Sequence, residues 1–85
     1  MKVSIIVPTL NEELGIEKTL TEIQQLSPHE LIVSDGGSTD HTESLATNFC
    51  DHLIKGIAGR ARQMNAGARQ ATGDILLFLH ADNQL

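Results

Sequence analysis

A chain of 85 residues is long enough for one domain, and with two phenylalanines, no tryptophan and no tyrosine its core must be aliphatic. The formal net charge of −5 and the shortage of aromatic side chains argue against a nucleic-acid partner, which needs cationic and stacking groups. Cys50 is the only cysteine, and no segment has the length of a signal peptide or a membrane span, so we expect a cytoplasmic protein with no membrane segment in this chain.

The charge is unevenly distributed. Residues 1–52 hold nine acidic residues against two lysines, whereas four of the six basic residues lie in the segment that follows. These four could meet a phosphate, or could form a solvated helix face, which is the more common outcome for such a run. They are Lys55, Arg60, Arg62 and Arg69.

The first predicted elements are a strand at residues 3–7 and a helix that ends near residue 26. The strand is β-branched and is ended by Pro8. Thr9 and Glu12 have the spacing of a capping box, with Asn11 as an alternative cap, so we expect the helix to begin there. Its buried stripe is expected to consist of Ile16, Leu20 and Ile23.

A second strand at residues 30–34 leads into a polar turn, and a second helix follows at residues 40–49. Ser38, Thr39 and Asp40 are suitable N-caps, and Glu43 stands three residues after Asp40. Leu45, Ala46 and Phe49 are expected to be buried.

The remaining elements are a short strand at residues 52–55, a helix at residues 60–72 and an apolar strand at residues 75–79. Small and apolar side chains recur along the helix and predict its inward face, which would comprise Ala61, Met64, Ala68 and Ala71. The resulting βαβαβαβ order predicts an α/β protein with a parallel sheet. Because so apolar a strand needs neighbours, we expect the chain to be the front part of a larger domain.

Polar segments follow the strands at residues 8–12, 34–40 and 80–83, and these converge on one rim of a parallel sheet. No Rossmann, Walker A or nucleophile-elbow pattern is present. From the residues alone, Asp35 could face a ligand or belong to a capped turn that binds nothing.

Three motifs in this order, VSIIVPTLNEE, LIVSDGGSTDHT and GDILLFLHAD, resemble the beginning of a family 2 glycosyltransferase with the GT-A fold. The resemblance covers residues 1–85 and implies a truncated GT-A domain. It also implies a Rossmann-like four-stranded sheet in the order 3-2-1-4, with the first two helices on one face and the third on the other.

The same resemblance implies a nucleotide-sugar donor and assigns residues to it. Pro8, Thr9, Asn11 and Glu12 would line the nucleoside pocket, and Asp35 would accept hydrogen bonds from the base. Asp82, matching the last acid of an Asp-x-Asp motif, would bind Mg²⁺ or Mn²⁺ at the donor diphosphate.

This chain departs from the family pattern at two positions. His80 replaces the first acid of Asp-x-Asp, and Met64 stands where the family often has arginine before Asn65. Arg60 or Arg62 could supply the lost charge. We include Arg62 and His80 among the expected nucleotide-binding residues.

In this family the acceptor site and the catalytic base follow the metal motif, so we expect the 85-residue chain to have no transferase activity alone. One alternative is a nucleotidyltransferase-like domain, although Thr-Leu-Asn-Glu replaces its glycine-rich loop. The other is a non-catalytic fragment with a vestigial site, which forms a homo-oligomer through the exposed edge of residues 75–79.

Overall fold

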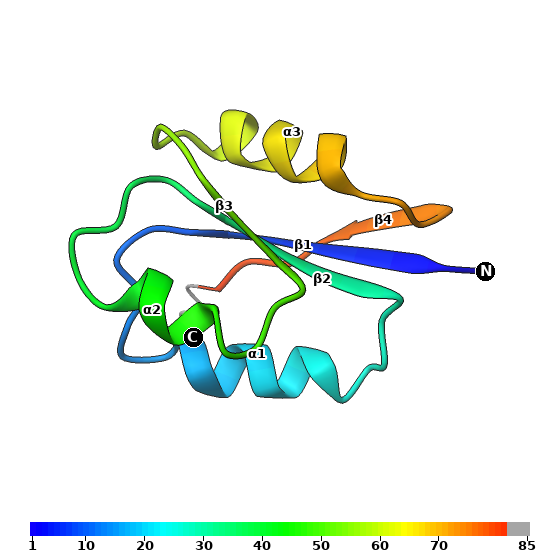
Figure 1. Cartoon of the computed structure of the whole chain (residues 1–85), viewed down its shortest axis with the longest axis horizontal. Helices are drawn as coiled ribbons and strands as arrows, with labels where there is room; N and C mark the ends of the chain where they lie inside the picture. Colours follow the sequence, from blue (N-terminus) through cyan, green and yellow to red (C-terminus); the bar gives the residue numbers. More distant parts are fainter. Residues whose placement is uncertain (82–85) are drawn as a thin grey trace.

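Four parallel strands form one sheet in the order β3-β2-β1-β4 in the computed structural model, which describes residues 1–81 (Figure 1). The expected fold class, βαβαβαβ order and strand order are confirmed. The elements are β1 (Val3–Thr9), α1 (Ile16–Gln24), β2 (Glu30–Asp35), α2 (Thr42–Ala46), β3 (His52–Lys55), α3 (Arg60–Gln70) and β4 (Ile75–Phe78).

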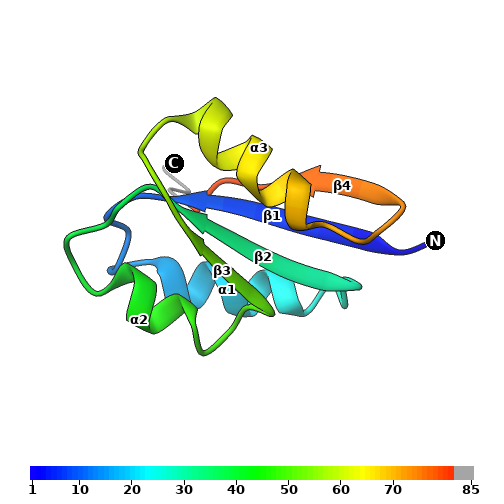
Figure 2. The same ribbon diagram turned by 45° about the horizontal axis from the view of Figure 1, so that its top comes forward.

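The helices lie on both faces of the sheet. Helices α1 and α2 cover one face and α3 covers the other, as both ribbon views show (Figures 1 and 2). This arrangement follows from right-handed crossovers between parallel strands. It also brings the start of α3 to the edge of the sheet where β1 and β2 end.

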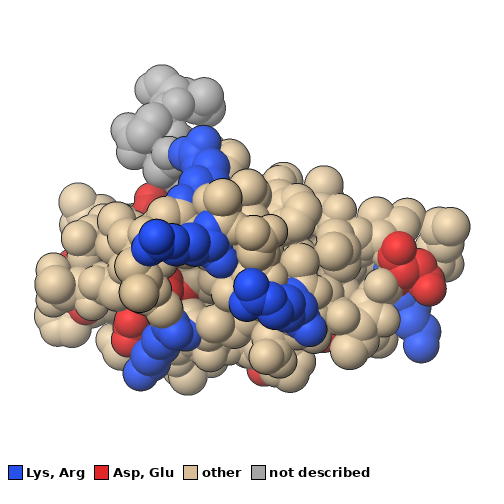
Figure 3. Space-filling model, turned by 90° about the horizontal axis from the view of Figure 1, so that it is seen from above, with Lys and Arg blue, Asp and Glu red and all other residues tan. Residues whose placement is uncertain are grey.

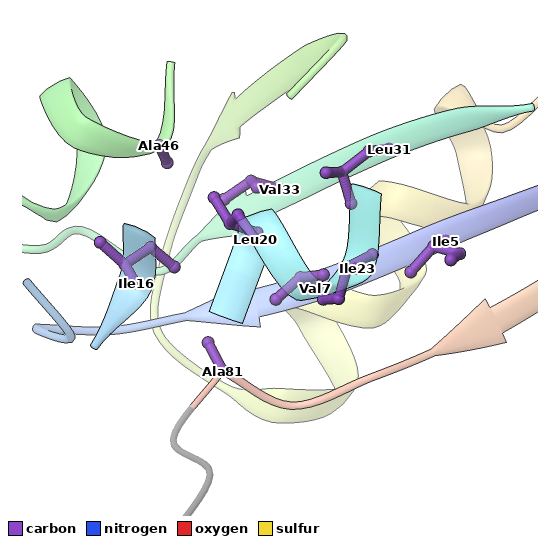
Figure 4. Close-up of a cluster of buried hydrophobic side chains, with 9 residues drawn as sticks. All are labelled: Ile5, Val7, Ile16, Leu20, Ile23, Leu31, Val33, Ala46 and Ala81. Atoms are coloured by element: carbon purple, nitrogen blue, oxygen red, sulfur yellow. The ribbon is translucent and has the colours of Figure 1, made fainter. Parts of the chain in front are cut away.

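The main hydrophobic core lies between the sheet and α1 (Figure 4). Alternation along β1 sends Ile5 and Val7 to this side, while Ile6 lies on the α3 side. The predicted α1 stripe is confirmed, since Ile16 and Leu20 are fully buried. The buried cluster comprises Ile5, Val7, Ile16, Leu20, Ile23, Leu31, Val33, Ala46 and Ala81.

Both of the first two helices are shorter than predicted. The expected capping box at α1 is wrong, because Gly15 is the N-cap residue and no side chain caps the helix. Helix α2 likewise begins after His41 without a side-chain cap and spans only five residues. The side chains that were expected to cap helices instead bond across loops.

Helix α3 turns a different face to the sheet from the one predicted. Its buried residues are Gln63 and Gly67, whereas Ala61 is exposed. The expectation was wrong by one position because it followed side-chain size and apolarity. Gly67 lies so close to β1 that an added Cβ would stand 2.4 Å from Cγ2 of Ile6.

Gln63 joins the start of α3 to the ends of two strands. Its Nε2 donates to the carbonyl oxygens of Thr9 at 2.8 Å and Ser34 at 2.9 Å, and its Oε1 accepts from the N–H of Gly59 at 3.1 Å. The side chain is buried, and it passes so close to Gly36 that a Cβ there would lie 2.9 Å from Oε1. One amide thus fixes α3 against the carboxyl ends of β1 and β2.

A buried carboxylate fixes the other end of α3. Glu30 Oε2 accepts from the Ser4 hydroxyl at 2.6 Å and from both the N–H and the hydroxyl of Thr72, and Ser4 in turn accepts from the N–H of Gly73. Burial favours a raised pKa for Glu30, but these hydrogen bonds and nearby His52 outweigh it, so the pKa is lowered. The segment after α3 is therefore held at the amino ends of β1 and β2.

Within residues 1–81, strand β4 pairs only with β1, and it is exposed along its length. Its four residues are between 38% and 42% exposed, although all are large and apolar. An exposed edge strand of this kind can pair with a strand of another chain. The homo-oligomer expected through this edge stays a prediction.

Replacing Gly67 by alanine should separate α3 from the sheet, because the new methyl group would overlap Ile6. We expect a loss of about 1–3 kcal/mol in the free energy of unfolding, measured by urea denaturation. Gly15→Ala is the matched control, since a Cβ there has no atom within 4 Å. An equal loss in both variants would contradict the close approach of α3.

Gln63→Met retains the volume of the side chain and removes its three hydrogen bonds. We expect unfolding to become easier by about 1–3 kcal/mol, because buried carbonyl groups lose a donor. Gln70→Met makes the same change at an exposed position of α3 and should leave stability nearly unchanged. Equal urea midpoints for Gln63→Met and the parent chain would show that the amide anchors nothing.

Candidate functional site

Two loops at the carboxyl edge of the sheet are joined by reciprocal hydrogen bonds. The N–H of Asn11 donates to the Ser38 hydroxyl at 2.9 Å, and Asn11 Oδ1 accepts from the N–H of Thr39 at 2.8 Å. The N–H of Glu12 donates to the Thr42 hydroxyl at 2.7 Å. The loop after β1 and the loop after β2 therefore hold each other in place, and Asn11 adopts a φ of 53° within this contact.

Asp40 belongs to the same contact. One carboxylate oxygen accepts from the N–H and the hydroxyl of Thr42, and the other accepts from the N–H of Glu13 at 3.3 Å. It was expected to cap α2, but it bonds two residues along the chain and across to the first loop.

Asp35, at the end of β2, is buried beneath these loops, with 1% of its surface exposed. Its Oδ1 accepts from the hydroxyls of Thr9 at 2.7 Å and Ser38 at 2.6 Å, and its Oδ2 accepts from the N–H groups of Gly37 at 3.0 Å and Ser38 at 2.7 Å. A carboxylate has about four acceptor positions, so the protein's own donors fill them.

A second carboxyl group lies beside Asp35. Burial raises the pKa of Asp35, but hydrogen bonds from Glu43, Ser38 and Thr9 outweigh it and lower the pKa overall. The hydrogen bond with Asp35 raises the pKa of Glu43, whose carboxylate also pairs with the Lys55 ammonium at 3.5 Å. When two carboxyl groups lie close together, the ionised form of one of them is disfavoured, and here that group is Glu43.

A pocket of about 310 Å³ opens where β1 and β4 end and α3 begins. It combines residues at the end of β1 with the first turn of α3 and the segment after β4. The lining residues are Pro8, Thr9, Leu10, Glu12, Gly59, Arg60, Gln63, His80 and Ala81.

This pocket brings together four of the residues that the sequence predicted for nucleotide binding, and separates the others from them. Pro8, Thr9, Glu12 and His80 line it. A second hollow, on the other side of Gln63, is lined by Asp35 and Arg62 among other residues. Asn11 lines neither of the two and lies in the loop contact.

Between the two candidate arginines, it is Arg60 that lines the pocket. The sequence left this choice open, because both positions follow the same glycine-rich connection. Gln63 was not predicted at all. Its signal in the sequence is its spacing of four residues from Gly67, which places both on one face of a helix.

The predicted metal ligand, Asp82, lies outside the described residues. Within residues 1–81, no group of three or more His, Cys, Asp or Glu side chains is arranged to hold a metal ion. The described part of the chain therefore does not supply a complete set of metal ligands.

No helix among residues 1–81 has the length and apolarity to cross a membrane.

Comparison with known proteins matches residues 4–85 to the family model of glycosyl transferase family 2. A PGL/p-HBAD biosynthesis glycosyltransferase of Mycobacterium bovis is 40% identical over 91 aligned positions, covering 96% of this chain and 36% of the relative. A GalNAc(5)-diNAcBac-PP-undecaprenol beta-1,3-glucosyltransferase of Campylobacter jejuni is 36% identical, covering 99% of this chain and 30% of the relative.

Solved structures also match this chain along nearly all of its length. Glucosyl-3-phosphoglycerate synthase of Mycobacterium tuberculosis in complex with Mn²⁺, UDP and glucosyl-3-phosphoglycerate matches with a TM-score of 0.83 and 29% identity. The match covers 94% of this chain and 33% of that structure. The same enzyme with Mn²⁺, UDP-glucose and glycerol 3-phosphate gives a TM-score of 0.82.

The chain spans about a third of the length of these relatives. The family model nevertheless covers nearly all of this chain, and the neighbouring structures share its fold with TM-scores of 0.83 and 0.82. The chain therefore belongs to glycosyl transferase family 2.

Proposed function

We propose that the pocket between β1, β4 and α3 binds the nucleotide part of a nucleotide-sugar donor, with UDP as the nucleotide. The observation that carries this proposal is the meeting of Pro8, Thr9, Glu12 and His80 in one pocket, from segments up to 72 residues apart. Its volume of about 310 Å³ lies within the range of small-molecule sites. Support also comes from the neighbouring structures that contain UDP or UDP-glucose.

Arg60 is the residue to which we assign the donor phosphates. It is exposed and lines the pocket at the first turn of α3, where the helix carries a partial positive charge. A guanidinium group at this position can bind two phosphate oxygens at once. Arg62 was the expected residue, and its part in nucleotide binding stays a prediction.

The base would be recognised by Asp35 only after a local rearrangement. All four of its acceptor positions are occupied, two of them by the hydroxyls of Thr9 and Ser38. A hydroxyl turns about one bond at little cost, whereas the two backbone N–H groups are fixed. We therefore assign to one hydroxyl the step of giving way to an N–H of the base.

A divalent cation at Asp82, either Mn²⁺ or Mg²⁺, stays a prediction, supported by the Mn²⁺ in the neighbouring structures. When bound, such an ion neutralises the charge that develops on a leaving nucleoside diphosphate. His80, which lines the pocket, stands two residues before this predicted ligand in the sequence.

Donor binding is the part of glycosyl transfer that we assign to these residues. The names of the relatives differ: one is a GalNAc(5)-diNAcBac-PP-undecaprenol beta-1,3-glucosyltransferase, and another is named for PGL/p-HBAD biosynthesis. The sugar and the acceptor are therefore not assigned from the pocket.

UDP should bind to the 85-residue chain, and Arg60→Gln should weaken that binding about tenfold, as expected when a charge-assisted hydrogen bond is lost. Isothermal titration calorimetry, with and without Mn²⁺, measures both. Parallel titrations with GDP and dTDP test the choice of base.

Lys18→Gln is the control, because it removes one positive charge from α1, away from the pocket. It should leave UDP affinity unchanged. Absence of UDP binding with Mn²⁺ present, or an equal loss in the two variants, would refute the donor site.

The buried carboxylate of Asp35 should make stability depend on pH. Its pKa is lowered in the folded state, so its stabilising contribution is complete above the unfolded value of about 3.9 and is lost as pH falls through the folded pKa. We expect Asp35→Asn to cost about 1–3 kcal/mol at pH 7 and less in acid, by urea unfolding across pH 3–7.

Asp74→Asn is the matched control. Asp74 is exposed and accepts one backbone hydrogen bond, from Lys2. A difference between Asp35→Asn and the parent chain that stays constant from pH 7 to pH 3 would show that ionised Asp35 does not stabilise the fold.

A further inference from the structure

A second hollow, of about 380 Å³, lies between α3 and the edge strand β3. Gln63 forms part of the wall of both this groove and the nucleotide pocket, and so separates them. Apart from Gln63, the two share no lining residue. The groove is lined by Ser34, Asp35, Ile54, Lys55, Gly56, Ile57, Arg62, Gln63, Asn65, Ala66 and Arg69.

Three cationic residues from two elements line this groove. Lys55 ends β3, while Arg62 and Arg69 stand seven residues apart on α3 and so share one side of the helix. Figure 3 views the α3 side of the molecule and shows Lys and Arg side chains gathered over it. This local excess of positive charge stands against a net charge of −5 for the chain.

The charges of the two arginines are not neutralised within the described part of the chain. The three ion pairs found there involve His41, His52 and Lys55, and neither Arg62 nor Arg69. The pair between Lys55 and Glu43 is open to solvent on the lysine side, so it is weak and can be exchanged for another anion. Among the described residues, the groove is therefore lined by two guanidinium groups that form no ion pair, and by Lys55, whose ammonium group is paired with Glu43.

Asp35 is the acidic residue that lines the groove. Its two oxygens accept hydrogen bonds from four donors of the protein, which offset its negative charge. Asn65 adds a neutral amide that can donate hydrogen bonds. No aromatic side chain lines the groove, so it has no stacking surface for a base.

We propose that the groove between α3 and β3 binds a small phosphate-bearing molecule at a site separate from the nucleotide pocket. Planar guanidinium groups pair with phosphate oxygens in a forked geometry, which favours phosphate over other anions. The volume suits a molecule of the size of a sugar phosphate and not a polymer. The groove shares Gln63 and Asp35 with the proposed nucleotide site, but the two arginines to which the phosphate is assigned, Arg62 and Arg69, lie outside the nucleotide pocket.

Inorganic pyrophosphate is the probe, added to the ¹⁵N-labelled chain at low ionic strength. We expect saturable shifts of the backbone amide signals of Gly56, Asn65 and Ala66, and these should persist when UDP is present in excess. Arg69→Gln should weaken the binding about tenfold, and Arg69→Lys should restore it only in part because it lacks the fork. Citrate at equal concentration should bind more weakly.

Lys18→Gln is again the control and should change nothing, since Lys18 lies on α1, on the opposite face of the sheet. The amide spectrum of each variant shows directly whether it is folded. The proposal is overturned if pyrophosphate shifts only the amides of Thr9 and Leu10, if UDP abolishes the groove shifts, if Arg69→Gln binds as the parent chain does, or if citrate binds more tightly. Failure of UDP to bind would leave this result standing, so the two proposals are tested apart.

Discussion

The arrangement of the site depends on one side-chain amide. Gln63 donates to carbonyl groups near the carboxyl ends of the two central strands and accepts from the backbone before α3. One of these carbonyls, that of Thr9, also accepts from the N–H of Gly36 at 3.0 Å, so Gln63 adds a donor from outside the sheet. By adding this donor from α3, Gln63 sets the distance between the helix and the sheet edge. It also divides the space above the edge into two separate hollows.

A second constraint is the exchange of hydrogen bonds between the two loops. Ser38, Thr42 and Asn11 are residue types that compete well for backbone donors and acceptors near them. Here their partners come from the neighbouring loop and not from the first turn of a helix. Helices α1 and α2 begin without side-chain caps as a result, and the loops gain a defined geometry. The side chains that could have capped the helices instead fix the loops at the edge where a ligand would bind.

The sequence was a good guide where one physical effect dominates. Apolar β-branched runs predicted four strands, and the spacing of Ile16, Leu20 and Ile23 predicted the buried side of α1. It misled at α3, because Gln63 and Gly67 are placed inward by hydrogen bonding and by close contact, neither of which hydropathy records.

The motif after β1 predicted that Pro8, Thr9 and Glu12 would lie together, and all three line one pocket because a strand end fixes where the following residues lie. Their part in nucleotide binding stays a prediction. The choice between Arg60 and Arg62 depends on the rotation of α3 about its axis, which a motif does not carry. The sequence also does not show that hydrogen-bond donors enclose Asp35. One donor is the hydroxyl of the distant Thr9, and another is the N–H of Gly37, whose position depends on the fold of the turn.

Helix α3 is fastened at both ends, by Gln63 at its first turns and by the network of Glu30, Ser4 and Thr72 just beyond its last. A helix that is held at both ends cannot pivot about either end. Adaptation to a ligand is thereby confined to short loops and to rotating hydroxyl groups, which move fast and over small distances. The walls that α3 contributes to both hollows are therefore held at a fixed distance from the sheet edge, which would limit the size of a ligand in either hollow.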